Sequence, residues 1–322
     1  MTLDRRALLA AALLLALPRV ARGQSWPAKP IRVIVPFAAG GAADSTARII
    51  LPHLGDRFGT TFVVENRTGA SGSIGGAVVA QSPADGHTLL YDASSHIVNP
   101  SLLRGLPFDY ATAFVPISLV ATFPQAISVR ADFPARTLGE LLEAARRRPG
   151  EISIGTQGNA TAGHLALARL ERSAAVKFTH VSYRGGAAAA RDLAGGTLDG
   201  TLITVLSTRP VVEAGRARML ALTVPQRLPA FADVPTLAES GFPGFDVSEW
   251  VGLFAPAGTP ASIVERLHAE LARVLSEEPI RARLEQLGAL PVGSTPSDFA
   301  RFVREGREAM AVLVREANIT AD

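Results

Sequence analysis

Short runs of β-branched and aliphatic residues alternate along the chain with longer segments in which apolar residues recur every three or four positions. The short runs have the length of strands and the longer segments have the helical period. Strands are predicted at residues 31–35, 61–65, 88–91, 117–120, 126–129, 151–155, 178–182, 198–204, 219–223 and 245–254. Helices are predicted at residues 43–58, 73–81, 137–147, 161–172, 187–193, 206–214, 262–276, 279–287 and 296–317. This alternation predicts an α/β fold with parallel strands and helices on both faces.

Prolines and irregular stretches interrupt this rhythm and indicate the domain organisation. Pro52 should kink the first helix or end it early, residues 92–116 form a loop-rich stretch, and Phe123-Pro124 separates two predicted strands. The chain then returns in a long strand near Trp250. We therefore expect two lobes, residues 26–122 plus 250–322 and residues 123–249, joined by two crossing segments. A cleft should lie between them at the carboxyl ends of strands.

The first 23 residues have the plan of a signal peptide. Arg5 and Arg6 precede an apolar run over residues 7–17, which is too short to span a bilayer. The sequence Ala21-Arg22-Gly23 then gives a small-residue exit suited to cleavage before Gln24. The adjacent arginines leave both the general secretory route and the twin-arginine route open. We expect a protein exported to the periplasm.

Charge and composition exclude several classes of function. The formal net charge is +3, and the leader carries all of it, so the mature chain is neutral and nucleic-acid binding is not indicated. Without cysteine there is no disulfide and no thiol nucleophile. The two lysines, Lys29 and Lys177, follow no phosphate-binding glycine loop, and the six histidines show no metal-type spacing. The sequence therefore predicts no metal and no cofactor, and an enzyme would lack a nucleophile.

Three loops of small residues, 36–44, 155–164 and 183–186, each follow a predicted strand and open a helix. Gly40 and Gly41 would let the backbone approach a ligand, and helix starts bind anions through unpaired N–H groups and the helix dipole. Alternatively, these glycines only make tight turns, and Asp44 acts near the helix start as a cap. If the loops face one cleft, each charge-assisted hydrogen bond to a carboxylate would contribute about 1.5–3 kcal/mol. Arg184 is the nearby cation, and its adjoining glycines also suit a solvent-facing turn.

Motifs from about residue 31 to the C-terminus resemble the Bug-type receptors, the substrate-binding proteins of tripartite tricarboxylate transporters. The motifs are residues 31–44, Val64-Glu65-Asn66-Arg67, Pro83-Ala84-Asp85-Gly86, Asn99-Pro100, Leu106-Pro107-Phe108-Asp109, residues 158–166, Tyr183-Arg184-Gly185, Asp233-Val234-Pro235-Thr236, Glu239-Ser240-Gly241 and residues 255–260. Each motif alone is weakly specific, but so many in register are specific to the family.

The resemblance implies a monomeric, two-lobed fold of the type II periplasmic binding proteins, each lobe a sheet flanked by helices, with the ligand cleft between the lobes. It implies no catalysis. The expected ligand is a small carboxylate: a di- or tricarboxylate, an acidic amino acid or an aromatic acid. The expected partner is a membrane permease of the same transporter type. Two alternatives remain, a sensor that signals to a membrane kinase and an α/β enzyme acting on organic acids.

The resemblance also implies the ligand-binding residues. In the family, the loop matching residues 36–44 and a partner loop in the second lobe bind a carboxylate end. The implied positions in these two loops are Phe37, Gly40, Gly41, Thr156, Asn159 and Thr161. Ser94, Ser95 and Tyr183 fall at family positions that reach the cleft. Where many relatives carry Phe-Asp-Asn, this chain has Ile203-Thr204-Val205, so Thr204 supplies a single hydroxyl.

Overall fold

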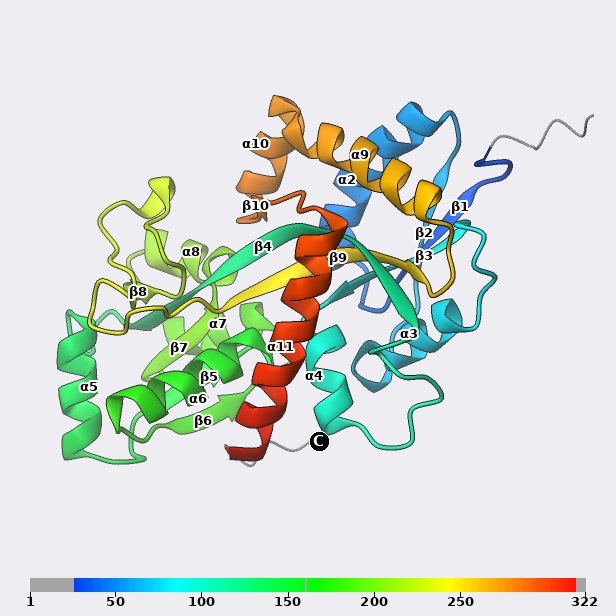
Figure 1. The fold of residues 1–322 in the computed structure, drawn as a ribbon. Coiled ribbons are helices and arrows are strands. Elements are labelled where there is room, and N and C mark those ends of the chain that lie inside the picture. The colour runs from blue at the N-terminus through cyan, green and yellow to red at the C-terminus, as the bar shows by residue number, and fades with distance from the viewer. Residues whose placement is uncertain (1–25, 160, 317–322) are drawn as a thin grey trace, which may run out of the picture.

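The computed structural model describes residues 26–159 and 161–316 (Figure 1). The predicted signal peptide therefore lies outside the described residues. Within the described part, helices flank a curled, mixed sheet whose two halves meet in one long strand. None of its helices combines the length and the apolar character that crossing a membrane requires.

The first half of the sheet is built from both ends of the chain. Its strand order is β2 (Phe62–Asn66), β1 (Ile31–Val35), β3 (Thr88–Ala93), β9 (Ser248–Pro256) and the first part of β4 (Phe114–Arg130), with β10 (Leu290–Pro291) also on β4. β1 pairs in parallel with β2 and β3, whereas β9 runs antiparallel to β3 and β4. This half is thus mixed rather than wholly parallel, because β9, which follows the second half in the chain, runs in the opposite direction to its neighbours β3 and β4.

Helices cover both faces of this half because β1 is apolar on both sides. Val33 and Val35 pack into one hydrophobic cluster and Ile34 into another, as the alternation of side chains along a strand requires. The first cluster holds α2 (Ala42–Phe58), α9 (Ala261–Ser276) and α10 (Glu278–Gln286). The second holds α3 (Ser73–Ala80), α4 (Ser95–Leu102) and α11 (Pro296–Glu316), and a short 3-10 turn, η1 (Ala70–Gly72), precedes α3.

The second half of the sheet is built from the middle of the chain. Its strand order is β8 (Ala217–Leu222), the last part of β4, β7 (Gly200–Thr204), β5 (Ser153–Thr156) and β6 (Thr179–Ser182). β5 is parallel to β6 and β7, and β4 is antiparallel to β7 and β8. The flanking helices are α5 (Leu138–Arg147), α6 (Ala162–Ala174), α7 (Gly186–Ala194) and α8 (Val205–Glu213), and a 3-10 turn, η2 (Pro229–Phe231), follows β8.

The two strands predicted on either side of Phe123-Pro124 are one continuous strand, β4. Pro124 is the last residue of β4 that pairs with β9, and Gln125 is the first that pairs with β7. The proline therefore stands where the strand changes partners, and its missing N–H removes no hydrogen bond from the middle of a ladder. The division into two lobes at these residues stays a prediction.

Two other predictions about elements hold only in part. The helix predicted over residues 43–58 is present as α2, and it does not end early at Pro52 but continues to Phe58, because the exposed proline faces solvent while Leu51 and Leu54 remain anchored in the core. The stretch 92–116 contains α4 and the start of β4 rather than loops alone. Ser94-Ser95 and Asn99-Pro100 have poor helix propensity, so α4 is favoured by packing: it contacts α11, and its Ile97 and Val98 are buried.

Gly252 shows why a glycine lies inside the buried strand β9. The ring of Phe299, from α11, lies directly over it, and a Cβ built on Gly252 would be 2.2 Å from the Phe299 Cζ atom. Phe299 is fully buried and also contacts the rings of Trp250 and Phe254. The glycine therefore lets α11 approach the sheet closely.

Candidate ligand-binding site

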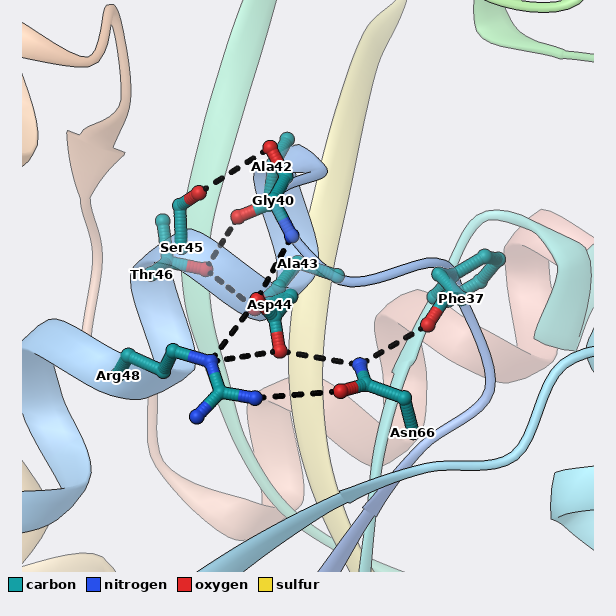
Figure 2. A network of polar contacts seen from close by, with 9 residues as sticks. All are labelled: Phe37, Gly40, Ala42, Ala43, Asp44, Ser45, Thr46, Arg48 and Asn66. Carbon is teal, nitrogen blue, oxygen red and sulfur yellow. Dashed lines mark hydrogen bonds and ion pairs between the residues drawn. The ribbon is translucent and has the colours of Figure 1, made fainter.

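Two backbone N–H groups of the loop between β1 and α2 donate hydrogen bonds to nearby residues of the same loop and helix. Gly40 has a φ of +78°, and its N–H donates to Asp44 Oδ2 over 2.8 Å (Figure 2). The N–H of Gly41 donates to the carbonyl oxygen of Ala38 over 3.2 Å. The two amides that the sequence suggested for an anion are thus hydrogen-bonded within the loop in this structure.

Asp44 is the centre of a polar network that fixes this loop (Figure 2). Arg48 Nε donates to both carboxylate oxygens, over 3.0 and 2.9 Å. Asn66 Nδ2 donates to Asp44 Oδ1 and to the carbonyl oxygen of Phe37, each over 3.0 Å. The Asp44 side chain is only 3% exposed. Burial would raise the pKa of Asp44, but the hydrogen bonds from Arg48, Gly40 and Asn66 outweigh it and lower the pKa below its usual value.

The loops that follow β5 and β6 are tied to each other. The buried Thr156 hydroxyl lies 2.7 Å from His180 Nε2 and 3.2 Å from the Gly158 carbonyl oxygen, to which Thr161 Oγ1 also donates over 2.8 Å. Tyr183 N donates to the Thr156 carbonyl oxygen over 3.1 Å. The structure therefore brings Thr156, Thr161 and Tyr183 together at the carboxyl ends of two adjacent strands, and the half-buried Asn159 lies in the same loop.

Tyr183 and Thr204 make their side-chain contacts within the second half of the sheet. The Tyr183 hydroxyl donates to Asp192 Oδ2 over 2.7 Å, and burial raises the pKa of Tyr183 to about 12. Thr204 Oγ1 accepts from Ser207 N at the start of α8, over 3.3 Å. Arg184 is exposed to solvent. These contacts hold the phenol and the hydroxyl in place at the ends of β6 and β7.

Ser94 and Ser95 connect the first loop to the start of α4. Ser95 Oγ donates to Asp92 Oδ1 over 3.1 Å. A Cβ built on Gly72 would lie 3.4 Å from both Pro36 Cβ and Ser95 Oγ, so Pro36, at the beginning of the first loop, adjoins the start of α4. The beginning of the first loop, next to Phe37, thus lies near Ser95.

Glu249 links this group to the group in the second half of the sheet, and the sequence analysis did not identify it. Its Oε1 accepts from Ser94 N over 3.2 Å and from Trp250 N over 3.3 Å. The backbone N–H of Ala162, next to Thr161 at the start of α6, also donates to its carboxylate. Burial raises the pKa of Glu249, and these hydrogen bonds oppose the rise. A charged residue within the long apolar segment 245–254 was the signal that could have found it.

A cavity of about 1220 Å³ lies on the side of the molecule that α11 covers. Its walls come from α4, α6, α11, the segment 224–229 and the segment 246–250. Ser94 is the one predicted site residue in its lining, and Ala162 and Trp250, whose N–H groups contact Glu249, also line it. Within residues 26–159 and 161–316, no cluster of three or more histidines and acidic residues could hold a metal ion.

A family model described as the tripartite tricarboxylate transporter family receptor matches residues 46–319. The chain belongs to this family. It is 39% identical over 305 residues to a UPF0065 protein from the tcbD-tcbE intergenic region of Pseudomonas sp. strain P51, with 94% of this chain and 91% of the relative covered. The family is one of periplasmic solute-binding receptors and not of enzymes, which confirms the predicted resemblance and the absence of catalysis.

Solved structures of receptors confirm the predicted fold class. Rpa4515 of R. palustris with adipate matches with a TM-score of 0.81 and 34% identity, over 92% of this chain and 99% of that chain. MatC (Rpa3494) from Rhodopseudomonas palustris with bound malate matches with a TM-score of 0.76 and 31% identity, over 90% of this chain and all of that chain. Both likenesses extend over nearly the whole described chain.

Proposed function

We propose that this receptor captures a small carboxylate in the periplasm and delivers it to the membrane permease of a tripartite tricarboxylate-type transporter. The observation that carries the proposal is the meeting of strand ends and helix starts from both halves of the sheet around Glu249. Anion sites form at such places because backbone N–H groups and helix dipoles favour negative charge, and the carboxylate of Glu249 itself accepts such N–H groups here. The adipate and malate complexes of the two R. palustris receptors support a carboxylate as the ligand class.

The proposed ligand contacts come from both sides of the cleft. They are Phe37, Gly40, Gly41, Ser94 and Ser95 on one side and Thr156, Asn159, Thr161, Tyr183 and Thr204 on the other. For Gly40 and Gly41 to bind a carboxylate, the loop must exchange its internal bonds to Asp44 and Ala38 for bonds to the ligand. The network around Asp44 keeps the loop close to its binding shape while this exchange occurs.

Closure of the two lobes on the ligand follows from the same proposal. The lobes are residues 26–122 plus 250–322 and residues 123–249, and the crossing parts of β4 and β9 would form the hinge. Small-angle scattering should show a smaller radius of gyration with saturating ligand than without it. An unchanged radius at saturation would contradict closure.

The carboxylate ligand is tested by native mass spectrometry of receptor purified gently from the periplasm. We expect a bound organic acid, which calorimetry with the purified acid then verifies at micromolar affinity, about −8 kcal/mol. Binding of neutral solutes by a receptor that binds no mono-, di- or tricarboxylate would refute the proposal. Mass spectrometry of the same sample also tests export, because cleavage of the leader should leave Gln24 at the N-terminus.

A further inference from the structure

Glu249 lies on the face of β9 that points away from α11. The neighbouring Trp250 faces α11, where its ring centroid is 5.7 Å from that of Phe299 and 5.5 Å from that of Phe302. Because successive side chains of a strand point to opposite faces, Glu249 points away from α11. There its carboxylate joins Ser94 at the start of α4 to Ala162 at the start of α6.

The Glu249 carboxylate accepts hydrogen bonds at the starts of two helices, α4 and α6. Its hydrogen-bond donors come from Ser94, Trp250 and Ala162, and all of them are uncharged. By contrast, the charge of Asp44 is paired with Arg48, and Asp92 contacts His96 over 3.0 Å. The groups that hold the Glu249 carboxylate in the described residues are therefore uncharged donors, and these hydrogen bonds rather than an ion pair oppose the rise that burial causes in its pKa.

A carboxylate in this position affects which ligands can enter. A second carboxylate brought near Glu249 would be repelled, because two like charges in a poorly solvated site disfavour each other. A ligand end that carries an N–H or O–H group could instead donate to the Glu249 oxygens, and an ammonium group would add charge attraction. The ligand carboxylate itself would remain with the loop donors.

We propose that Glu249 determines ligand specificity: the receptor takes a carboxylate with one negative charge whose other end donates a hydrogen bond, and it disfavours dicarboxylates. This inference rests on the proposed function and narrows its ligand class. The protein's own carboxylate at the starts of α4 and α6 would then require the distal end of the ligand to be a hydrogen-bond donor and not a second carboxylate.

Two sets of acids that differ only at one end test the proposal by calorimetry on the mature receptor. The six-carbon set is adipate, 6-hydroxyhexanoate and 6-aminohexanoate, and the four-carbon set is succinate, 4-hydroxybutanoate and 4-aminobutanoate. In at least one set, the wild-type receptor should bind the hydroxy or amino acid at least tenfold more tightly than the diacid. Glu249→Gln should reduce that preference at least tenfold. Glu265→Gln, which removes an equal charge from an exposed position of α9, should leave it unchanged.

Two outcomes would overturn the inference and leave the proposed function standing. In the first, the wild-type receptor binds each diacid as tightly as the hydroxy and amino acids of the same set. In the second, Glu249→Gln weakens the binding of all acids of a set equally, which would indicate a structural role alone. If no acid of either set and no copurified acid binds, the proposed function fails and the inference with it. Thermal unfolding verifies that Glu249→Gln is folded. If it is not, the ranking of acids by the wild-type receptor still decides.

Discussion

Replacing Asp44 by asparagine tests whether the network in Figure 2 fixes the first loop. Asparagine keeps the size of the side chain and one acceptor, but its amide nitrogen would face a donor from Gly40, Arg48 or Asn66. Hydrogen bonds to charged groups contribute about 1.5–3 kcal/mol each. Arg48 is 52% exposed and regains hydration when it is released, so its share falls toward the lower end of that range. We expect the free energy of unfolding to fall by about 2–3 kcal/mol.

Urea denaturation at pH 7 measures this change, provided that the slope with denaturant is the same for both proteins. Asp56→Asn is the matched control, because it removes the same charge from an exposed position of the same helix. The control should change the free energy by less than about 0.5 kcal/mol. A loss for Asp44→Asn no larger than that of the control would refute the role assigned to the network.

The pH dependence of the same difference gives an independent check. The pKa of Asp44 is lowered in the folded protein, so the folded state favours the ionised form more than the unfolded chain does. The stabilisation is therefore fully present above the unfolded pKa, about 3.9, and is lost as the pH falls through the folded pKa. The difference between wild type and Asp44→Asn should be constant from pH 5 to 8 and shrink below about pH 4.

Four further substitutions follow from backbone geometry and exposure. Gly40→Ala places a side chain at a φ of +78°, so it should lower the free energy of unfolding by about 1–2 kcal/mol and weaken carboxylate binding in calorimetry. Gly41→Ala, at a φ of −73°, should have a smaller effect on both the stability and the binding. Equal effects would show that the left-handed geometry is unimportant. Gly252→Ala would drive a methyl group into the Phe299 ring and should lower stability by about 1–3 kcal/mol in thermal unfolding, and an unchanged midpoint would contradict that packing. Arg184→Ala should change carboxylate affinity by no more than about 1 kcal/mol, because Arg184 is exposed, and loss of binding would instead assign the carboxylate to a cation.

The strands and helices with strong periodicity could be predicted from the sequence because local patterns determine them. β1 and α6, for example, lie within a residue or two of their predicted limits. β4 could not be predicted as one strand, because the pairing that makes Pro124 tolerable joins it to residues more than 70 positions away. α4 was missed for a related reason, since its residues favour a loop locally and its packing against α11 comes from the far end of the chain.

The candidate site divides in the same way. Of the loop positions, Gly40 could be proposed because a glycine after a strand and before a helix suggests an anion contact, whereas Thr156 was implied only by the family resemblance. The internal bonds of those loops depend on Asn66 and His180, which lie on neighbouring strands, so local sequence does not reveal them. Glu249 could not be placed by any loop motif, because its partners Ser94 and Ala162 come from two different regions of the chain.

The position of β9 between β3 and β4 constrains the order in which the molecule can assemble. A chain that emerges from its N-terminus first contains β3 and β4 before β9 is available, and both then present an unpaired edge. The last part of β4 finds β7 and β8 earlier, because these strands precede β9 in the chain. The second half of the sheet can therefore fold first, whereas β3 and the first part of β4 can pair only after β9, residues 248–256, has been synthesised. A fragment that stops short of residues 248–256 would therefore expose the unpaired edges of β3 and β4. Such edges promote aggregation, whereas in the complete receptor β9 joins the two strands into one continuous sheet.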